Sequence, residues 1–310
     1  MKKVKTIVTG GAGFIGSHIA EELVSGGYQV IIVDDLSTGK LTNIEPFLRK
    51  GTVEFVQGSI TDLDLLQKLF KGVTYVFHQA ALASVPRSVK DPISTHEANV
   101  TGTLNVLVAA RDNGVKKVIY ASSSSVYGDT PTLPKKEDMP PSPQSPYAVS
   151  KLAGEYYCQA FHKIYGLPTV SLRYFNVYGP RQDPDSQYAA VIPLFIKRAL
   201  NGEVPVIFGD GEQSRDFTFV KDVVAANILS TKEDITGVYN IATGQRITVN
   251  KLAEIIINLT KSKVAPVHEQ PRAGDVLHSL ADISKAKRFG YKPEWHVEEG
   301  LKVTTRSFCK

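Results

Sequence analysis

Tyr147 and Lys151 are the residues of this sequence whose types and spacing most directly indicate acid–base chemistry. They lie four positions apart at the start of a predicted helix, so both side chains project from one helix face. A lysine cation and the positive end of a helix lower the pKa of a nearby phenol and make it a usable base near neutral pH. The spacing alone is weak evidence, because the chain has 13 tyrosines. Ser145 and Pro146 strengthen the prediction, since a serine N-cap followed by proline is typical of a helix start.

Four consecutive serines, residues 122–125, form a second group that could take part in catalysis. They follow the apolar run KKVIYAS and precede Val-Tyr-Gly. Ligands of open α/β sheets bind at the carboxyl ends of the strands, which is where these hydroxyls are expected. A polar loop would have the same composition, so the residues alone leave open whether a serine does chemistry and which one.

A glycine turn near the amino terminus predicts a dinucleotide site. Gly10, Gly13 and Gly16 lie in TGGAGFIG, between a predicted strand and a predicted helix. Glycines there let the backbone approach a pyrophosphate, which then rests on the helix N-terminus. Asp34 closes the second predicted strand, where a carboxylate accepts hydrogen bonds from the adenosine ribose and repels a 2′-phosphate. This favours NAD over NADP, although Lys40 lies nearby and could weaken the discrimination.

The elements that must position these groups alternate along the first half of the chain. Short β-branched runs (VKTIVT, QVIIV, VEFV, TYVFH and KKVIYAS) are separated by amphipathic stretches, the first of which begins near Phe14. This alternation predicts an α/β fold of the Rossmann type, a doubly wound parallel sheet covered by helices on both faces. Residues 130–146 contain six prolines and are predicted to form a loop.

The second half of the chain is predicted to form a smaller C-terminal α/β lobe. It has helical patterns at about 190–201 and 249–260, and strand patterns at VPVIFG and GVYNIA. We expect residues 1–170 to form the NAD-binding domain and residues 171–310 the lobe that binds the substrate. The boundary is predicted to be interdigitated, and residues at about 214–240 could return to the first domain.

Composition excludes several other classes of protein. The 310 residues are 42% hydrophobic, enough for a large core, and the net charge of +5 comes from scattered lysines and arginines, so no nucleic-acid partner is expected. No run of about 18 apolar residues and no secretory signal is readable, which predicts a soluble, cytoplasmic protein without a membrane partner. Cys158 and Cys309 are the only cysteines, so neither a disulfide framework nor a cysteine metal site is expected.

Several motifs together carry a family resemblance. TGGAGFIG, VDD, FHQAA, EANVTGT, SSSSVYG, YAVSK, LRYFNVYGPRQ, GDGEQSRDF and PRAGD occur in this order between residue 4 and about residue 301. In this set the chain resembles the extended short-chain dehydrogenase/reductase family, most closely its nucleotide-sugar 4-epimerases of the UDP-glucose 4-epimerase type. The resemblance implies an isomerase with bound NAD and a UDP-sugar substrate.

The resemblance also assigns residues to the cofactor. It places NAD along the glycine turn, with Asp34 on the ribose and Asn99 supporting the site from a neighbouring helix. The full set is Gly10, Gly13, Phe14, Ile15, Gly16, Asp34, Asp35, Ser59, Ile60, Gln79, Ala80, Ala81, Asn99, Tyr147, Lys151 and Phe175. Ser59 departs from an aspartate common in the family, and Ala83 from a lysine found in some epimerases, which weakens two cofactor contacts.

The mechanism implied by the resemblance centres on Tyr147, which takes the proton of the sugar 4-hydroxyl while carbon 4 gives a hydride to NAD. Lys151, together with the helix end and the oxidised nicotinamide, lowers the tyrosine pKa, and Ser123 holds the 4-hydroxyl. The 4-keto sugar then turns about its diphosphate link and receives the hydride on its other face. Ser122 is expected to satisfy backbone groups of the turn. The residues assigned to the substrate are Ser123, Ser124, Asn176, Val191, Arg215, Arg272, Asp275 and Ser279.

Alternative functions differ in particular residues. Dehydratases and decarboxylases of the family place an acid directly before Val-Tyr-Gly, where this chain has Ser124 and Ser125, which favours an epimerase. Ser279 stands where epimerases restricted to UDP-glucose and UDP-galactose usually have a tyrosine, so we expect N-acetylated sugars to be accepted as well. A UDP-glucuronate 4-epimerase stays open, with Arg87 or Arg181 facing the 6-carboxylate. An NAD-sensing regulator without activity is the non-enzyme alternative.

A homodimer is the expected assembly, by resemblance. Relatives dimerise through a four-helix seam, and residues 97–114 have apolar side chains at Val100, Leu104, Leu107 and Val108 that could face a partner copy. Burial against the protein's own sheet would give the same stripe, so the sequence leaves both readings open.

Overall fold

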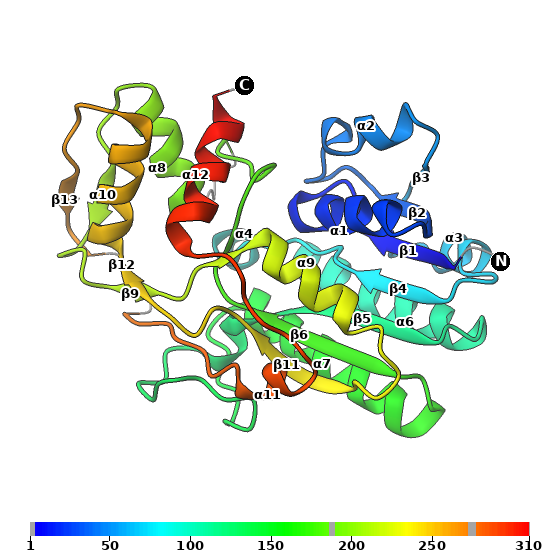
Figure 1. Cartoon of the computed structure of the whole chain (residues 1–310). Coiled ribbons are helices and arrows are strands. Elements are labelled where there is room, and N and C mark those ends of the chain that lie inside the picture. Colours follow the sequence, from blue (N-terminus) through cyan, green and yellow to red (C-terminus); the bar gives the residue numbers. More distant parts are fainter. Residues whose placement is uncertain (1–3, 186–189, 272–276, 310) are drawn as a thin grey trace.

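The computed structural model describes residues 4–185, 190–271 and 277–309, and its centre is a seven-stranded parallel sheet (Figure 1). The strands lie in the order β11 (Gly237–Ile241), β6 (Thr169–Tyr174), β5 (Lys117–Ser123), β4 (Tyr75–His78), β1 (Lys5–Thr9), β2 (Gln29–Asp34) and β3 (Val53–Gln57). The order reverses between β1 and β4, which is where open sheets of this kind bind their ligands. The predicted doubly wound α/β fold is confirmed.

Helices cover both faces of the sheet because the strands are apolar on both sides. Along β1, Ile7 and Val8 are both fully buried but belong to different core clusters, as the two-residue period of a strand requires. The cluster around Val8 includes α1 (Phe14–Ser25) and α9 (Val220–Leu229). The cluster around Ile7 includes α6 (Gly102–Asp112) and α7 (Pro146–Tyr165), with α3 (Leu63–Leu69) beside α6.

A smaller lobe lies beside the sheet, at the upper left of Figure 1. Its core joins α8 (Val191–Leu200), α10 (Val249–Thr260) and α12 (Val297–Phe308). Short strand pairs frame these helices: β8 (Val206–Phe208) with β13 (Val267–Glu269), β9 (Ser214–Arg215) with β12 (Ile247–Thr248), and β7 (Val177–Tyr178) with β10 (Thr218–Phe219).

The chain crosses between the two parts more than once. Residue 170 falls inside β6, and β11 adds residues 237–241 to the edge of the large sheet. Between these strands, α9 packs on α1. A single cut therefore does not separate the sheet from the lobe, because segments from both halves of the chain build the core around Val8.

Most predicted elements occur where their local signals place them. Helix α1 begins at Phe14, and α7 begins at Pro146 with the Ser145 hydroxyl accepting a hydrogen bond of 3.2 Å from the N–H of Ala148. The helical patterns in the second half correspond to α8 and α10. The sequence analysis did not anticipate α2 (Glu45–Leu48), α4 (Val85–Lys90), α5 (Pro92–His96), the π-helical turn Glu97–Thr101, α11 (Ser284–Arg288) or α12.

The apolar stripe of residues 97–114 faces the protein's own core. Val100 and Leu107 are buried, and Leu104 and Val108 pack against the cluster on that face of the sheet. The alternative that the stripe forms a partner surface is therefore wrong for Val100 and Leu107, whereas Leu104 and Val108 are only partly buried. In the part of the chain that the structure describes, no helix is long and apolar enough to cross a membrane.

Candidate active site

A cleft of about 830 Å³ opens at the carboxyl ends of β1, β2, β4 and β5. Its lining contains most of the residues predicted to hold the cofactor: Gly10, Gly13, Phe14, Ile15, Gly16, Asp34, Asp35, Ser59, Ile60, Gln79, Ala80, Ala81, Tyr147 and Lys151. Asn99 and Phe175 lie outside the lining. Asn99 is buried behind it, where its amide bonds the backbone of Leu82 and the hydroxyl of Ser150, and Phe175 packs against Tyr127 in the core.

The glycine turn brings two backbone segments close together. Gly10 has φ +66°, and a Cβ there would stand 2.6 Å from the backbone nitrogen of Ala80 at the end of β4. A Cβ on Gly16 would collide with the carbonyl oxygen of Gly10. The N-cap of α1 is Gly13, which has no side chain to cap the helix, and the first turn has no acidic residue. The free N–H groups and the positive helix end therefore fit a pyrophosphate.

Asp34 is held by the backbone at the end of β2. Its Oδ2 accepts from the N–H of Ala12 at 2.9 Å and its Oδ1 from the N–H of Leu36 at 2.8 Å. Burial raises the pKa of this carboxyl, and these hydrogen bonds act against the rise. Both oxygens retain a lone pair for ribose hydroxyls. Lys40 forms an ion pair of 3.0 Å with Asp183, so its charge is engaged beside the cleft rather than directed at a 2′-phosphate.

Tyr147 and Lys151 lie on one face of the first turns of α7, at the other end of the cleft. The N–H of Tyr147 donates to the Ser88 hydroxyl at 3.1 Å, which fixes the start of the helix against α4. The Nζ of Lys151 donates to the carbonyl of Ala121 on β5 at 2.8 Å and lies 6.0 Å from the centroid of the Tyr147 ring. Burial lowers the pKa of Lys151 to about 8, so it carries a charge at neutral pH.

In the protein alone, burial raises the pKa of Tyr147 above the ordinary value for a phenol, and a hydrogen bond with Ser123 opposes the rise only in part. Burying a phenolate away from water costs more free energy than its attraction to one nearby cation supplies. The predicted lowering depends on Lys151, the helix end and an oxidised nicotinamide acting together, so it stays a prediction for the protein with its cofactor.

The four serines have different partners. Ser122 donates to the carboxylate of Glu155, while Ser123 accepts the N–H of Ser125 at 3.2 Å and caps the 3-10 turn Ser124–Tyr127. The prediction that Ser122 satisfies backbone groups of the turn is wrong, since Ser123 does so. The hydroxyl of Ser125 is buried without a hydrogen-bond partner in the described part of the protein.

Of the residues predicted to bind substrate, Asn176, Arg215 and Ser279 lie on neighbouring segments outside the lining of the cleft. The amide of Asn176 donates to the carbonyl of Asp216 at 3.0 Å and to the hydroxyl of Ser279 at 3.4 Å. Arg215 lies on β9 and donates to the carbonyls of Ser214 and Leu277. Val191 is the first residue of α8, and Ser123 and Ser124 are partly buried at the end of β5. Arg272 and Asp275 lie outside the described residues.

Two buried charged groups near these sites were missed. Asp216 accepts hydrogen bonds from Thr243, Gly244 and Ala281, which ties together the loops around Arg215 and Ser279. Glu155 on α7 forms an ion pair with Arg173 on β6. A signal was present for the ion pair, because Arg173 is the one charged residue of the strand TVSLRY and Glu155 follows Lys151 by one helical turn.

Comparison with known proteins gives consistent matches over the whole chain. Residues 6–242 match the model of the NAD dependent epimerase/dehydratase family. A UDP-glucose 4-epimerase of Mycolicibacterium smegmatis is 39% identical over 98% of this chain and 98% of its own length.

Two solved structures are similar in fold as well as in sequence. A UDP-N-acetylglucosamine 4-epimerase from Methanobrevibacter ruminantium, solved in complex with UDP-N-acetylmuramic acid, is 48% identical, with a TM-score of 0.96 over 100% of this chain and 99% of that one. A UDP-glucose 4-epimerase from Thermotoga maritima, solved with UDP-glucose, is 42% identical, with a TM-score of 0.94 over 99% of both chains.

Proposed function

The chain belongs to the NAD dependent epimerase/dehydratase family, and from this premise we propose that it interconverts UDP-glucose with UDP-galactose, and UDP-N-acetylglucosamine with UDP-N-acetylgalactosamine. The broader activity is that of an NAD-dependent UDP-sugar 4-epimerase, an isomerase. One observation carries the proposal. Tyr147 and Lys151 of α7 lie beside the end of β5, and they line the same cleft as the glycine turn that fits a pyrophosphate.

In the proposed reaction Tyr147 takes the proton from the sugar 4-hydroxyl and later returns one. Bound NAD supplies the acceptor and donor of the hydride, and there is no net redox change. Ser123 holds the 4-hydroxyl by a hydrogen bond. Lys151 is charged below about pH 8 and faces the Tyr147 ring, so it favours the phenolate over the phenol.

The nucleotide has to stay anchored while the sugar turns. Asn176 and Arg215 are the described residues to which we assign this anchoring. A guanidinium donates a fork of hydrogen bonds that matches phosphate oxygens. Arg215 projects from a strand whose next residue, Asp216, is tied to two other loops, which supports a rigid anchor.

Acceptance of N-acetylated sugars rests on Ser279. Its hydroxyl lies 3.4 Å from the amide of Asn176, so a small side chain occupies the wall of the proposed sugar pocket. A large side chain there would fill the space that a 2-acetamido group needs. One pocket residue changes substrate preference by roughly 10- to 200-fold.

The decisive experiment is to incubate the purified protein separately with UDP-glucose, UDP-N-acetylglucosamine and UDP-glucuronate and to follow the anomeric protons by NMR. We expect the first two to be converted and Tyr147→Phe to convert neither. Failure to convert UDP-N-acetylglucosamine at saturating concentration would refute the broader specificity. Ser279→Tyr is the matched variant, and it should lose N-acetylated sugars while keeping UDP-glucose.

UDP-glucuronate is included because Arg87 lines the cleft. Arg181, the other cation considered for the 6-carboxylate, is bonded to Glu21 at 2.6 Å and to Ser17 at 3.3 Å and lies against α1. Conversion of UDP-glucuronate alone would assign the chain to that substrate. A regulator that only senses NAD would convert none of the three.

We also propose that the protein is a homodimer whose seam includes the outer face of α4, α5 and α7. Ile93 is 78% exposed and Val89 66%, and Val149 and Tyr156 are also exposed on α7. These three helices pack on one another, so the four apolar side chains lie on adjoining elements. Light scattering of the purified protein tests the proposal, which fails if the protein is a monomer.

A further inference from the structure

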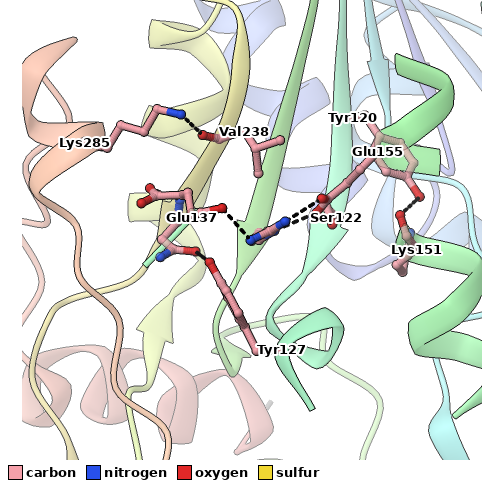
Figure 2. Close-up of polar contacts among 10 residues, drawn as sticks. Tyr120, Ser122, Tyr127, Glu137, Lys151, Glu155, Val238 and Lys285 are labelled. Carbon is pink, nitrogen blue, oxygen red and sulfur yellow. Dashed lines mark hydrogen bonds and ion pairs between the residues drawn. The ribbon is translucent and has the colours of Figure 1, made fainter. Parts of the chain in front are cut away.

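A buried ion pair between Glu155 and Arg173 joins α7 to β6, and Figure 2 shows Glu155 beside Ser122 with its dashed contacts. The Nε of Arg173 donates to Oε1 of Glu155 at 2.8 Å, and NH2 donates to Oε2 at 2.7 Å. The two side chains are 4% and 0% exposed. A buried ion pair is weak evidence for stability, because the cost of removing two charges from water offsets their attraction. The pair therefore calls for another explanation.

Glu155 has a second partner at the end of β5. The Ser122 hydroxyl donates to the same Oε1 that receives Arg173, and Figure 2 shows Ser122 and Glu155 in contact. One turn earlier on α7, Lys151 donates to the carbonyl of Ala121 at 2.8 Å. Helix α7 thus holds two successive residues of β5, Ala121 and Ser122. The next residue of the strand is Ser123.

Arg173 is itself held on its far side, so it gives Glu155 a fixed support. Its guanidinium lies 4.7 Å from the centroid of the Tyr127 ring, and the Tyr127 hydroxyl donates to Asn240 at 2.7 Å (Figure 2). The N–H of Asn240 in turn donates to the Glu137 carboxylate at 2.8 Å. Arg173 therefore holds Glu155 from β6 and is itself supported by Tyr127 of the turn after β5, which is linked through Asn240 to Glu137 of the loop 130–146.

We propose that Glu155 is a positioning residue which, through Ser122, sets the place of Ser123 relative to Tyr147. Glu155 and Tyr147 are both on α7, whereas Ser123 is on β5, so the hydroxyl of Ser122 is a side-chain link between the two elements that carry the proton-transfer groups. Misplacement of a reacting group by about 1 Å costs on the order of 100-fold in rate. The inference rests on the proposed epimerase function.

The first test is Ser122→Ala, which removes the link and leaves the ion pair in place. We expect kcat for UDP-glucose to fall about tenfold, with KM and the amount of co-purified NAD within about twofold of the parent protein. Thr169→Val is the matched control. Thr169 also ties α7 to the sheet by one buried hydroxyl, donating to the Cys158 carbonyl at 2.8 Å, but at the opposite end of β6. This control should leave kcat within about twofold.

The second test replaces the pair itself by Glu155→Leu with Arg173→Met, a change that often preserves stability because no buried charge is left without its partner. If the Glu155–Arg173 pair contributes only to packing, this double variant should keep the parent kcat whenever it keeps the parent melting temperature. We expect it instead to have the lowered kcat of Ser122→Ala at an unchanged melting temperature. Adding Ser122→Ala to the double variant should cause no further loss, because both changes break one pathway.

The proposal is overturned if Ser122→Ala has the parent kcat, if the stable double variant does, or if the losses multiply in the triple variant. Failure of the epimerase function is distinguished by the parent protein, which would then not convert any UDP-sugar. Should Glu155→Leu with Arg173→Met fail to fold, Ser122→Ala and Thr169→Val still decide the matter, because each removes only a hydroxyl.

Discussion

Asp216→Asn is expected to weaken substrate binding far more than catalysis. In the structure Oδ1 of Asp216 accepts the N–H of Thr243 at 2.9 Å and its hydroxyl at 2.6 Å. Oδ2 accepts the N–H of Gly244 at 3.0 Å and that of Ala281 at 3.3 Å. An asparagine keeps the shape but has only one oxygen. With its NH2 group toward Thr243, one backbone N–H loses its acceptor, because the Thr243 hydroxyl can rotate and accept instead; with NH2 toward Gly244 and Ala281, two N–H groups lose theirs.

The magnitude follows from the donors left without an acceptor. Each buried unpaired N–H costs about 1–3 kcal/mol, so the less costly orientation of the asparagine costs roughly 1–3 kcal/mol. The loss falls on the loops that Asp216 joins, which lie beside Arg215 and Ser279. When about 1.4–2.8 kcal/mol of this cost is subtracted from the free energy of substrate binding, KM rises roughly 10- to 100-fold. Catalytic groups on α7 and β5 are not bonded by the Asp216 carboxylate, so kcat should change less than about threefold.

Steady-state kinetics with UDP-glucose and calorimetric titration with UDP measure this effect. Asp222→Asn is the matched control, because Asp222 is also a buried carboxylate that accepts two backbone N–H groups, from Glu294 at 2.9 Å and Trp295 at 3.4 Å, in a segment to which no substrate contact is assigned. It should lower stability without changing KM. A parent-like KM in Asp216→Asn, or a collapse of kcat at unchanged KM, would refute the reasoning.

Three further predictions concern the cofactor, the pH dependence and the assembly. Gly10→Ala should reduce co-purified NAD at least about tenfold, because Gly10 has φ +66° and a Cβ there would stand 2.6 Å from the Ala80 nitrogen. The NAD released on denaturation measures the occupancy, and full occupancy would contradict the prediction. Burial lowers the pKa of Lys151 to about 8, so the lysine is charged below pH 8 and loses its charge above it. We therefore expect kcat to fall as the pH rises past 8. The residual turnover of Lys151→Arg should show no such fall, because arginine keeps its charge. Ile93→Glu combined with Val149→Glu should give a monomer by light scattering, and a persisting dimer would exclude this face.

Local signals account for the features that the sequence predicted well. Helix α7 begins where Ser145 and Pro146 predict, because a cap and a fixed φ act within one turn. The glycine turn was readable for a similar reason, since Gly10 occupies a positive-φ position and Gly16 a close approach within the same motif. The parallel pairing of the strands was predicted from their alternation with helices.

Contacts between distant residues were decided only by the tertiary structure. Glu155 pairs with Arg173, and Asp216 with Ala281, across 18 and 65 positions of the chain, and nothing in the local pattern specifies these partners. The pKa of Tyr147 also depends on how much of the folded protein surrounds the phenol.

The amino-acid sequence alone therefore predicted the fold class, and it located the glycine turn and the pair Tyr147 and Lys151, because the signals for each lie within a few residues of each other. Only the folded chain shows which charged side chains are buried and which loops are bonded to one another. It also shows that Leu107 faces the sheet. Burial and long-range pairing are properties of the packed chain, because they depend on which surfaces exclude water together.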